Sequence, residues 1–519
     1  MLGSLEIKWC DLLKIWFLTF ESIYTRKIGG LAEVPPRLAL ELRKLKYDTW
    51  VLTPGHGVEC SEESRIPYRL ETNDAEYYFE ECLFETPHIL VKGGLFNEST
   101  VYPKHRLVEK ALLFGRIVSS YYKFSLESGQ TPVIVHGNDW HSVPALLGIN
   151  ALSVNYGVKT RFIYHIHLLT STIIAMNDFI EYLNIYNDTW IRGFKGILSF
   201  REYYDLSKGF VDKLGSYISD KVITVSNSFV KNIVRNIGLE HSSRVDYVFN
   251  ATTWDWSSVC KSIEKLFKVD PFELSSRDYV RKLLLTKYLS RINYSIEDSF
   301  LKKFVEETAG KYGVKYTDCF DKDGPLVFLS GRVSRQKGFD ILIKALDKLI
   351  TEIPDIRLIL AVIPTHGSEE LFKKLVETIV LYREHLRLIP GLVDGDYYRS
   401  LYYASTVYLA LSRFEPFGLI SLESMASGTP VVASRTGGFI DTVIDLRRDM
   451  ERGNGLLIEP GSVDELVNGV RFMVDLMYYR EDRELAARIR NNCIERSRFF
   501  NWSSSAKKLV SIYNSVTGV

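Results

Sequence analysis

The segment LVFLSGRVSRQKGFD, residues 326–340, is the stretch of sequence that decides the fold. It begins with an apolar run, Leu326 to Ser330, that predicts a buried strand. A loop bounded by glycines, Gly331 to Gly338, follows directly, and beyond it apolar residues recur at helical spacing. A buried strand, a glycine loop and a helix are typical of one half of a βαβ unit. We therefore expect a parallel sheet covered by helices.

The same alternation of strands and helices extends in both directions from this segment. After it, strands are expected at residues 358–363, 386–389, 407–411 and 430–433. Before it, a helix is expected over about 33–45, and strands are expected at residues 14–20, 49–52, 133–136, 162–167 and 222–225. The fold class indicated is α/β, with two doubly wound, Rossmann-like domains.

The length of 519 residues also favours two domains, because it exceeds what one hydrophobic core usually organises. We expect an N-terminal domain over residues 1–250 and a C-terminal domain over residues 251–498. A helical insertion is expected at about 261–323, where charged residues and helix formers interrupt the strands. The remaining residues, 499–519, predict a helix that crosses back to the N-terminal domain.

Composition excludes several classes of function. The net charge of +1 gives no field that would recruit nucleic acid or an anionic membrane. The sequence contains no uninterrupted run of about twenty apolar residues, so no membrane span is predicted. The cysteines are far apart and form no CxxC pair, so we expect neither a zinc site nor a disulfide framework, and a cytoplasmic location. They are Cys10, Cys60, Cys82, Cys260, Cys319 and Cys493.

Two glycine loops between a strand and a helix carry cations suited to phosphate. Lys27 precedes Gly29 and Gly30, and such glycines let the backbone approach a phosphate at a helix N-terminus. In the second loop, Arg332 can clamp phosphate oxygens and Lys337 can neutralise another, which suits a diphosphate leaving group. Tight turns and solvated cations would leave the same pattern, so the alternative of a purely structural role stays open for both loops.

A third group of residues combines carboxylates with glycines. Glu415 follows a predicted strand and Glu423 lies eight residues later inside the next helix. In doubly wound folds a carboxylate at the carboxyl end of a strand faces the ligand crevice, and one on the helix can bind ribose hydroxyls. Gly418 and Leu419 open that helix, and Gly437 and Gly438 open the next one.

Polar residues gather at two strand ends of the first domain. Asp139 and Trp140 follow one strand, and His165 and His167 end the next on the same face. A histidine pair can bind a metal, but no third ligand with suitable spacing accompanies it. Hydrogen bonding of a histidine to backbone or to a sugar hydroxyl is the favoured interpretation.

These pieces resemble the glycogen and starch synthases, a family of retaining glycosyltransferases with the GT-B architecture of two Rossmann-like domains facing a deep cleft. The resemblance extends over nearly the whole chain. It rests on KIGGLAEV (27–34), HGNDWHS (136–142), His167, ITVSNSF (223–229), Asn250, GRVSRQKGFD (331–340) and FEPFGLISLES (414–424).

The resemblance implies transfer of glucose from ADP-glucose or UDP-glucose to the non-reducing end of an α-1,4-glucan, without a metal or other cofactor. It implies catalytic roles for Glu415, His167, Arg332 and Lys337, and a sugar site lined by Asp139 and Trp140. The residues implied in binding the nucleotide sugar are Lys27, Gly29, Gly30, Asn250, Gly418, Leu419, Glu423, Gly437 and Gly438.

The sequence also departs from the family pattern. The family's asparagine is usually followed by glycine, whereas Asn250 is followed by Ala251, and His167 is followed by Leu168 instead of asparagine. Gly391 to Val393, the expected base-binding turn, has no aromatic residue and does not distinguish adenine from uracil. Two alternatives stay open: a transferase with a small acceptor, forming trehalose or sucrose, and a catalytically silent glucan-binding protein.

Overall fold

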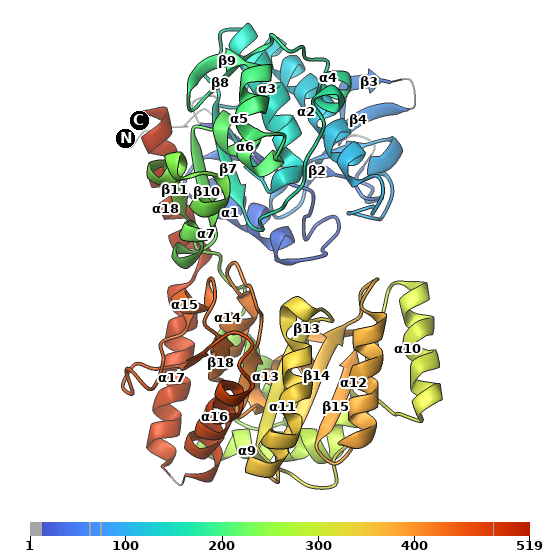
Figure 1. Cartoon of the computed structure of the whole chain (residues 1–519), viewed down its shortest axis with the longest axis vertical. Helices are drawn as coiled ribbons and strands as arrows, with labels where there is room; N and C mark the ends of the chain where they lie inside the picture. Colours follow the sequence, from blue (N-terminus) through green and yellow to red (C-terminus); the bar gives the residue numbers. More distant parts are fainter. Residues whose placement is uncertain (1–12, 62–63, 73–74, 481, 519) are drawn as a thin grey trace, which may run out of the picture. The chain divides into compact units, whose positions relative to one another are not determined.

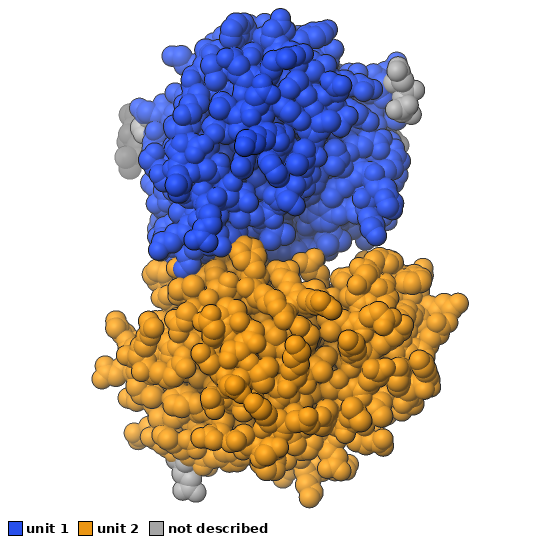
Figure 2. Space-filling model, viewed as in Figure 1, with its two compact units in different colours: residues 1–250, 502–519 blue, residues 251–501 orange. Residues whose placement is uncertain are grey.

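The computed structural model describes residues 13–61, 64–72, 75–480 and 482–518. These residues form two compact units, drawn in different colours in Figure 2. Unit 1 comprises residues 1–250 and 502–519, and unit 2 comprises residues 251–501. Cys10 and Leu12, at the start of the first apolar stretch, lie outside the described residues.

Unit 2 is built on a parallel sheet of six strands in the order β15-β14-β13-β17-β18-β19 (Figure 1). The chain runs outward from β13 to β15 and then returns to the other side of β13 with β17. The carboxyl ends of β13 and β17 therefore form the topological switch point, where doubly wound sheets bind ligands. The strands are β13 (Leu326–Arg332), β14 (Arg357–Ile363), β15 (Leu386–Pro390), β17 (Val407–Ala410), β18 (Val431–Ser434) and β19 (Gly455–Ile458).

Helices with an apolar face cover this sheet because each crossover between parallel strands requires one. In α11, for example, Phe339, Leu342, Leu346 and Leu349 are all buried. The helices of the sheet are α11 (Phe339–Glu352), α12 (Glu369–Leu381), α13 (Gly395–Ala404), α14 (Leu419–Ala426), α15 (Phe439–Thr442), α16 (Val463–Val474) and α17 (Arg483–Phe499). The region expected as an insertion contains α8 (Trp256–Phe267), α9 (Leu274–Leu283) and α10 (Ser299–Tyr312).

Unit 1 contains a sheet of nine described strands in the order β11-β10-β7-β6-β1-β2-β5-β4-β3. Pairing is parallel from β11 to β5 and antiparallel from β5 to β3. The order in which the chain adds strands reverses at β1, which has β2 on one side and β6, also parallel to it, on the other. The strands are β1 (Lys14–Leu18), β2 (Asp48–Pro54), β3 (Arg65–Glu71), β4 (Glu76–Leu83), β5 (Pro87–Lys92), β6 (Ile134–Asn138), β7 (Arg161–Ile166), β10 (Lys221–Thr224) and β11 (Val245–Tyr247).

The two α/β domains with parallel sheets confirm the expected fold class. The antiparallel edge was not expected, because β3 has the sequence RIPYRLE and no apolar run. The last helix, α18 (Trp502–Thr517), packs on unit 1 through α1 (Val34–Lys44), and the Ser505 hydroxyl donates to the carbonyl of Phe249. Among the described helices, none joins the length to the apolar character that crossing a bilayer requires.

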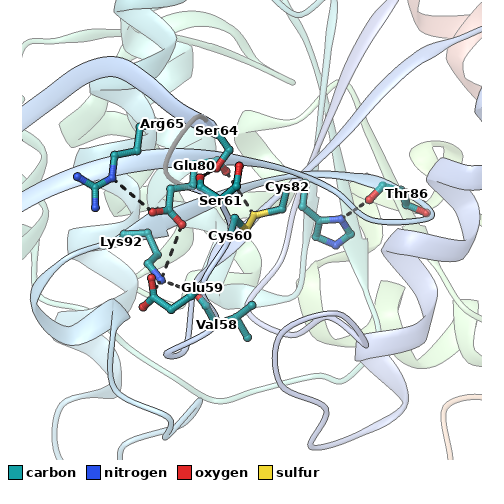
Figure 3. Close-up of a disulfide and its surroundings, with 11 residues drawn as sticks. Val58, Glu59, Cys60, Ser61, Ser64, Arg65, Glu80, Cys82, Thr86 and Lys92 are labelled. Atoms are coloured by element: carbon teal, nitrogen blue, oxygen red, sulfur yellow. Dashed lines mark hydrogen bonds and ion pairs between the residues drawn. A yellow bond between two sulfur atoms is a disulfide. The ribbon is translucent and has the colours of Figure 1, made fainter.

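The structure overturns the expectation of no disulfide. Cys60, in the loop after β2, is bonded to Cys82 of β4 (Figure 3). The two cysteines are separated by 22 residues, and no short motif marks a pairing of this kind. Beside the disulfide, the Lys92 ammonium is fully buried and lies 3.9 Å from the Glu80 carboxylate. A disulfide is rare in a reducing interior, so this bond removes one of the arguments for a cytoplasmic location.

Candidate functional site

The first half of the candidate site lies at the switch point of unit 2. Arg332 ends β13 and is exposed, and its side chain makes no hydrogen bond or ion pair within the described part of the chain. Lys337, in the short 3-10 helix Arg335–Lys337, turns back so that its stem lies along Gly331. One loop thus presents one free cation and a second, largely buried one; that this loop binds phosphate stays a prediction.

Glu415 is held beside this loop by two partners. The Lys337 ammonium donates to Glu415 Oε2 at 2.6 Å, and the Ser412 hydroxyl donates to the same oxygen at 3.1 Å. The side chains of Lys337 and Glu415 are only 15% and 14% exposed. Partial burial strengthens such a pair relative to one in water and fixes the position of the carboxylate. Residues 78 positions apart therefore meet at the carboxyl ends of β13 and β17.

The glycines of this half-site allow two loops to touch. A Cβ at Gly437, whose φ is +46°, would lie 1.8 Å from the carbonyl oxygen of Glu415. Gly438 donates its N–H to the same carbonyl at 3.0 Å. Gly418, with φ +88°, immediately precedes Leu419 at the start of α14. The glycines thus have a steric role in shaping the loop around Glu415, whatever they bind.

Glu423 projects from α14 into a cluster of tyrosines. The Tyr402 hydroxyl donates to Glu423 Oε2 at 3.3 Å, and Tyr398 donates to the Ser330 hydroxyl at 2.8 Å. Ser330 also lies 3.0 Å from the hydroxyl of Tyr408. Burial raises the pKa of Tyr402 and Tyr408 well above the usual range, so these hydroxyls stay protonated. These tyrosines were not identified from the sequence, although the spacing of Tyr398 and Tyr402 along one helix face was a usable signal.

The second half of the candidate site lies in unit 1, at the carboxyl ends of β1, β6 and β7. After β1, Lys27 donates to Glu33 Oε1 at 2.7 Å and is 55% exposed. The N–H groups of Ile28 and Gly29 donate to Glu21 Oε2 at 2.8 and 2.7 Å. Gly30 then opens the 3-10 helix Gly30–Glu33. Glu21 was not identified from the sequence, because a carboxylate seven residues before its partners has no local signature.

Asp139 connects β6 to β7 by hydrogen bonds. Its carboxylate accepts the N–H groups of His167 at 2.7 Å and Leu168 at 3.1 Å. Burial raises the pKa of this carboxyl to about 8, and the two N–H donors only partly offset burial. Asp139 also has φ +55°, a conformation that non-glycine residues rarely adopt and that concentrates at functional sites. Trp140 follows it, buried, with its ring 4.2 Å from that of His141.

His167 offers one unused ring nitrogen. Its Nε2 lies 3.0 Å from Asn138 Oδ1, and the amide nitrogen of Asn138 donates to Leu18, so Nε2 carries the proton. Nδ1 is buried and makes no hydrogen bond with the residues that the structure describes. Burial lowers the pKa of His167 to about 3, so the ring is neutral. A neutral acceptor of this kind suits a hydroxyl group.

Behind His167 a ring contact and two hydrogen bonds lead to the C-terminal helix. The rings of His165 and His167 are 4.1 Å apart, and His165 Nδ1 lies 3.3 Å from His136 Nε2. His136 Nδ1 in turn lies 2.7 Å from the hydroxyl of Tyr513 in α18. Among the described residues, the group of three potential metal ligands is Cys60, Glu80 and Cys82, whose cysteines are joined; His165 and His167 belong to no such group of three.

The expected residues thus come together in two sets. Lys337, Glu415, Gly437 and Gly438 meet in unit 2, and Asp139 meets His167 in unit 1. Lys27 is engaged by Glu33. Asn250 is the last residue of unit 1 before unit 2, and its buried Oδ1 makes no hydrogen bond within the described chain.

Two doubly wound units, one with cations at its switch point and one with neutral polar groups at its strand ends, define the GT-B class of glycosyltransferases. The starch synthase catalytic domain matches residues 14–244, and the glycosyl transferases group 1 domain matches residues 319–496. The chain belongs to the glycogen and starch synthase family.

Full-length relatives agree with these matches. The glycogen synthase of Thermosipho melanesiensis is 25% identical over 522 residues, covering 97% of this chain and 98% of the relative. That of Clostridium kluyveri is 24% identical, covering 97% of this chain and 100% of the relative. The catalytic domain of starch synthase IV from Arabidopsis thaliana, solved with ADP and acarbose, shares the fold with a TM-score of 0.71 at 18% identity, covering 98% of this chain and 100% of that chain.

Proposed function

We propose that this chain is a glycogen synthase that transfers glucose from ADP-glucose or UDP-glucose to the non-reducing end of an α-1,4-glucan with retention of configuration. The observation that carries the proposal is the loop after β13, where the free Arg332 and the Glu415-bound Lys337 lie at a switch point. That arrangement is suited to a diphosphate bonded to a sugar, because it offers cations for the leaving group and a fixed carboxylate for the sugar.

Loss of a nucleoside diphosphate develops negative charge on the leaving oxygen. Arg332 and Lys337 are positioned to stabilise that charge without waiting for solvent to reorganise. Lys337 is fixed by Glu415 before any donor binds, so little ordering is needed at the moment of reaction. Glu423, with the hydroxyl of Tyr402 beside it, is our proposed contact for the ribose hydroxyls.

Unit 1 is proposed to bind the sugar. The neutral His167 can accept a hydrogen bond from a glucose hydroxyl through Nδ1, and Asp139 holds the backbone of His167 in place. Trp140 provides an aromatic surface next to this histidine-rich region. Lys27 is proposed to act on the donor phosphates, which requires it to exchange Glu33 for the ligand.

The acceptor is proposed to be a glucan because the full-length relatives are named glycogen synthases, and one solved relative was bound to ADP and acarbose. Structures of a sucrose-phosphate synthase from Thermosynechococcus elongatus and a trehalose-phosphate synthase from Burkholderia vietnamiensis each share the fold with a TM-score of 0.57. Transfer to a small acceptor is therefore the alternative that the experiment must distinguish from transfer to a glucan. We further propose that the reaction needs no metal and takes place in the cytoplasm.

The deciding experiment measures release of nucleoside diphosphate from ADP-glucose and from UDP-glucose, with and without glycogen, in the presence of a chelator. The proposal expects release that depends on glycogen, lengthening of α-1,4 chains, and a preference for one donor. Release with free glucose or a sugar phosphate but not with glycogen would replace the proposal by a small-acceptor transferase. Binding of glycogen without release would indicate a silent binding protein.

A further inference from the structure

A separate pocket of about 350 Å³ opens in unit 2 among α8, α9, α13 and α17. Its volume falls in the range of small-molecule sites. None of its described lining residues belongs to the loops after β13 and β17, so it is not the half-site that holds Glu415. One wall is aromatic and the other carries arginines: Trp256, Phe272 and Tyr403 on one side, Arg277, Arg490 and Arg498 on the other.

Arg277 is fixed in the floor of this pocket. Its Nη1 donates to the carbonyl of Tyr403 and to Thr429 Oγ1 at 3.0 Å, and its Nη2 donates to the carbonyl of Ser427 at 2.8 Å. The guanidinium also lies 4.2 Å from the centre of the Tyr403 ring. It is 4% exposed. These contacts use three hydrogen bonds of a group with five donors, so Arg277 is rigid and still able to donate.

Arg490 is a second arginine of this pocket, and its side chain has no partner among the described residues. It makes no hydrogen bond or ion pair with any described residue, and it is partly buried. Burial, and then the charge of Arg277, lower its pKa to about 9, which shows that its charged form is disfavoured where it lies. Asp278, the carboxylate that acts on Arg490 most strongly, is already paired with Arg281 at 2.7 Å.

The other charges of the pocket do not neutralise Arg490. Glu495 is paired with Arg498 at 2.5 Å. Glu273 is exposed, at the rim where α9 begins. Two guanidinium groups beside one another in a partly buried pocket repel each other unless an anion lies between them. Phosphate is an anion whose geometry guanidinium groups match, and its oxygens can accept hydrogen bonds from both groups.

We propose that this pocket binds a small phosphate ester, with its phosphate between Arg277 and Arg490 and its ring against Trp256 and Phe272. Trp256 packs edge-on to Phe272 and nearly parallel to Tyr403, with ring centres 5.9 and 6.0 Å apart. Such an aromatic wall accepts the apolar face of a sugar or the flat face of a base. A phosphorylated sugar and a nucleoside monophosphate share this chemistry.

The pocket is connected to the donor half-site through α14. Arg277 holds the carbonyl of Ser427 at the carboxyl end of α14, the helix that carries Glu423. It also holds the carbonyl of Tyr403, which adjoins Tyr402, the partner of Glu423. A ligand on Arg277 would therefore act on the two helices that position Glu423, and donor KM is the kinetic quantity that would respond.

The test is calorimetric titration of the full chain with inorganic phosphate, a hexose monophosphate and AMP. Arg490→Gln should weaken binding of the preferred ester about tenfold or more, because a charge-assisted pair is lost. The side chain of Arg490 has no hydrogen bonds to lose, so the variant should unfold at the same temperature as the native chain. Arg488→Gln, an exposed arginine on the same helix and outside the pocket, is the matched control and should bind as the native chain does.

Two further variants separate the possible sources of a signal. Arg332→Ala removes the free cation of the donor half-site and should leave this binding unchanged. Phe272→Ala, at a side chain 69% exposed, should weaken binding of the ester but not of inorganic phosphate. The proposal is overturned if no ester binds, if Arg490→Gln binds as tightly as the native chain, or if Arg332→Ala abolishes the signal. The tighter of the two esters identifies the class of ligand.

Discussion

The two half-sites differ in charge: the one in unit 2 is centred on charged side chains and the one in unit 1 on neutral polar ones. In unit 2, Arg332, Lys337 and Glu415 are charged groups at loop ends, two of them paired and one free. In unit 1, His167 is neutral and burial raises the pKa of Asp139 to about 8. The first half-site is suited to a charge that develops in a reaction, and the second to uncharged hydroxyl groups. A nucleotide sugar has both kinds of group, a diphosphate and uncharged hydroxyls.

The largest difference between the two units is expected in how their stability responds to acid. Burial lowers the pKa of imidazoles throughout unit 1, so the unfolded chain binds more protons than the folded unit below about pH 6.5. Stability is therefore present above pH 6.5 and falls as the pH drops toward 4. The histidines concerned are His56, His88, His136, His141, His165, His167 and His241.

Two carboxyls act in the opposite direction, because burial raises the pKa of Asp139 to about 8 and of Asp212 to about 6. Their contribution is fully present below about pH 4 and is lost as the pH rises through these values. The imidazoles are more numerous, so unit 1 should unfold at a lower temperature at pH 5 than at pH 7. Calorimetry with limited proteolysis checks this. Unfolding of unit 2 before unit 1 on acidification would contradict the prediction.

Glu415→Ala should abolish turnover while the fold stays intact. The substitution removes a fixed carboxylate and leaves Lys337 largely buried without its partner. We expect kcat to fall roughly 10³-fold or more. Initial rates of nucleoside diphosphate release measure it. Glu384→Ala, at an exposed glutamate after α12, is the control, and equal activity of both variants would remove Glu415 from the mechanism.

Arg332→Ala should lower kcat by raising the activation barrier about 2 to 4 kcal/mol, because a preorganised cation that stabilises the leaving group is removed. The fold should be unaffected, since Arg332 has no partner in the described chain. Arg335→Ala, in the same loop and also exposed, should change the rate little. A defect limited to the KM for glucan would contradict the role of Arg332 at the donor.

Reduction of the disulfide should destabilise unit 1 by about 3 kcal/mol, the loop-closure value for a separation of 22 residues. The described free cysteines, Cys260, Cys319 and Cys493, all lie in unit 2, which should melt as before. Melting with and without reductant, compared with Cys82→Ser, checks the assignment. A native chain isolated from cells with free Cys60 and Cys82 would restore the argument for a reducing location.

His167→Ala should have the smallest effect, about 1 to 2 kcal/mol, because it removes one neutral hydrogen bond to the sugar and leaves Asn138 without its donor. Steady-state kinetics of donor turnover measure it. His105→Ala, at an exposed histidine of unit 1, is the control. A loss as large as that of Glu415→Ala would show that unit 1 supplies more than hydroxyl binding.

Much of the fold follows from local pattern. The apolar runs that predicted β1, β6, β7 and β13 contain residues that the structure buries, and the two glycine loops follow β1 and β13 as expected. The edge strand β3 could not be recognised, because its exposed, charged sequence forms a strand only by pairing with β4.

The sequence by itself determined the α/β class and the positions of the two glycine loops between strand and helix, since these depend on apolar spacing and glycine positions within a few residues. Only the tertiary structure decided the partners: Lys337 with Glu415, Glu21 with the Gly29 loop, Cys60 with Cys82, and His136 with Tyr513. Such pairs join side chains far apart in the chain, and their energies depend on distance and burial, which exist only after the chain has folded.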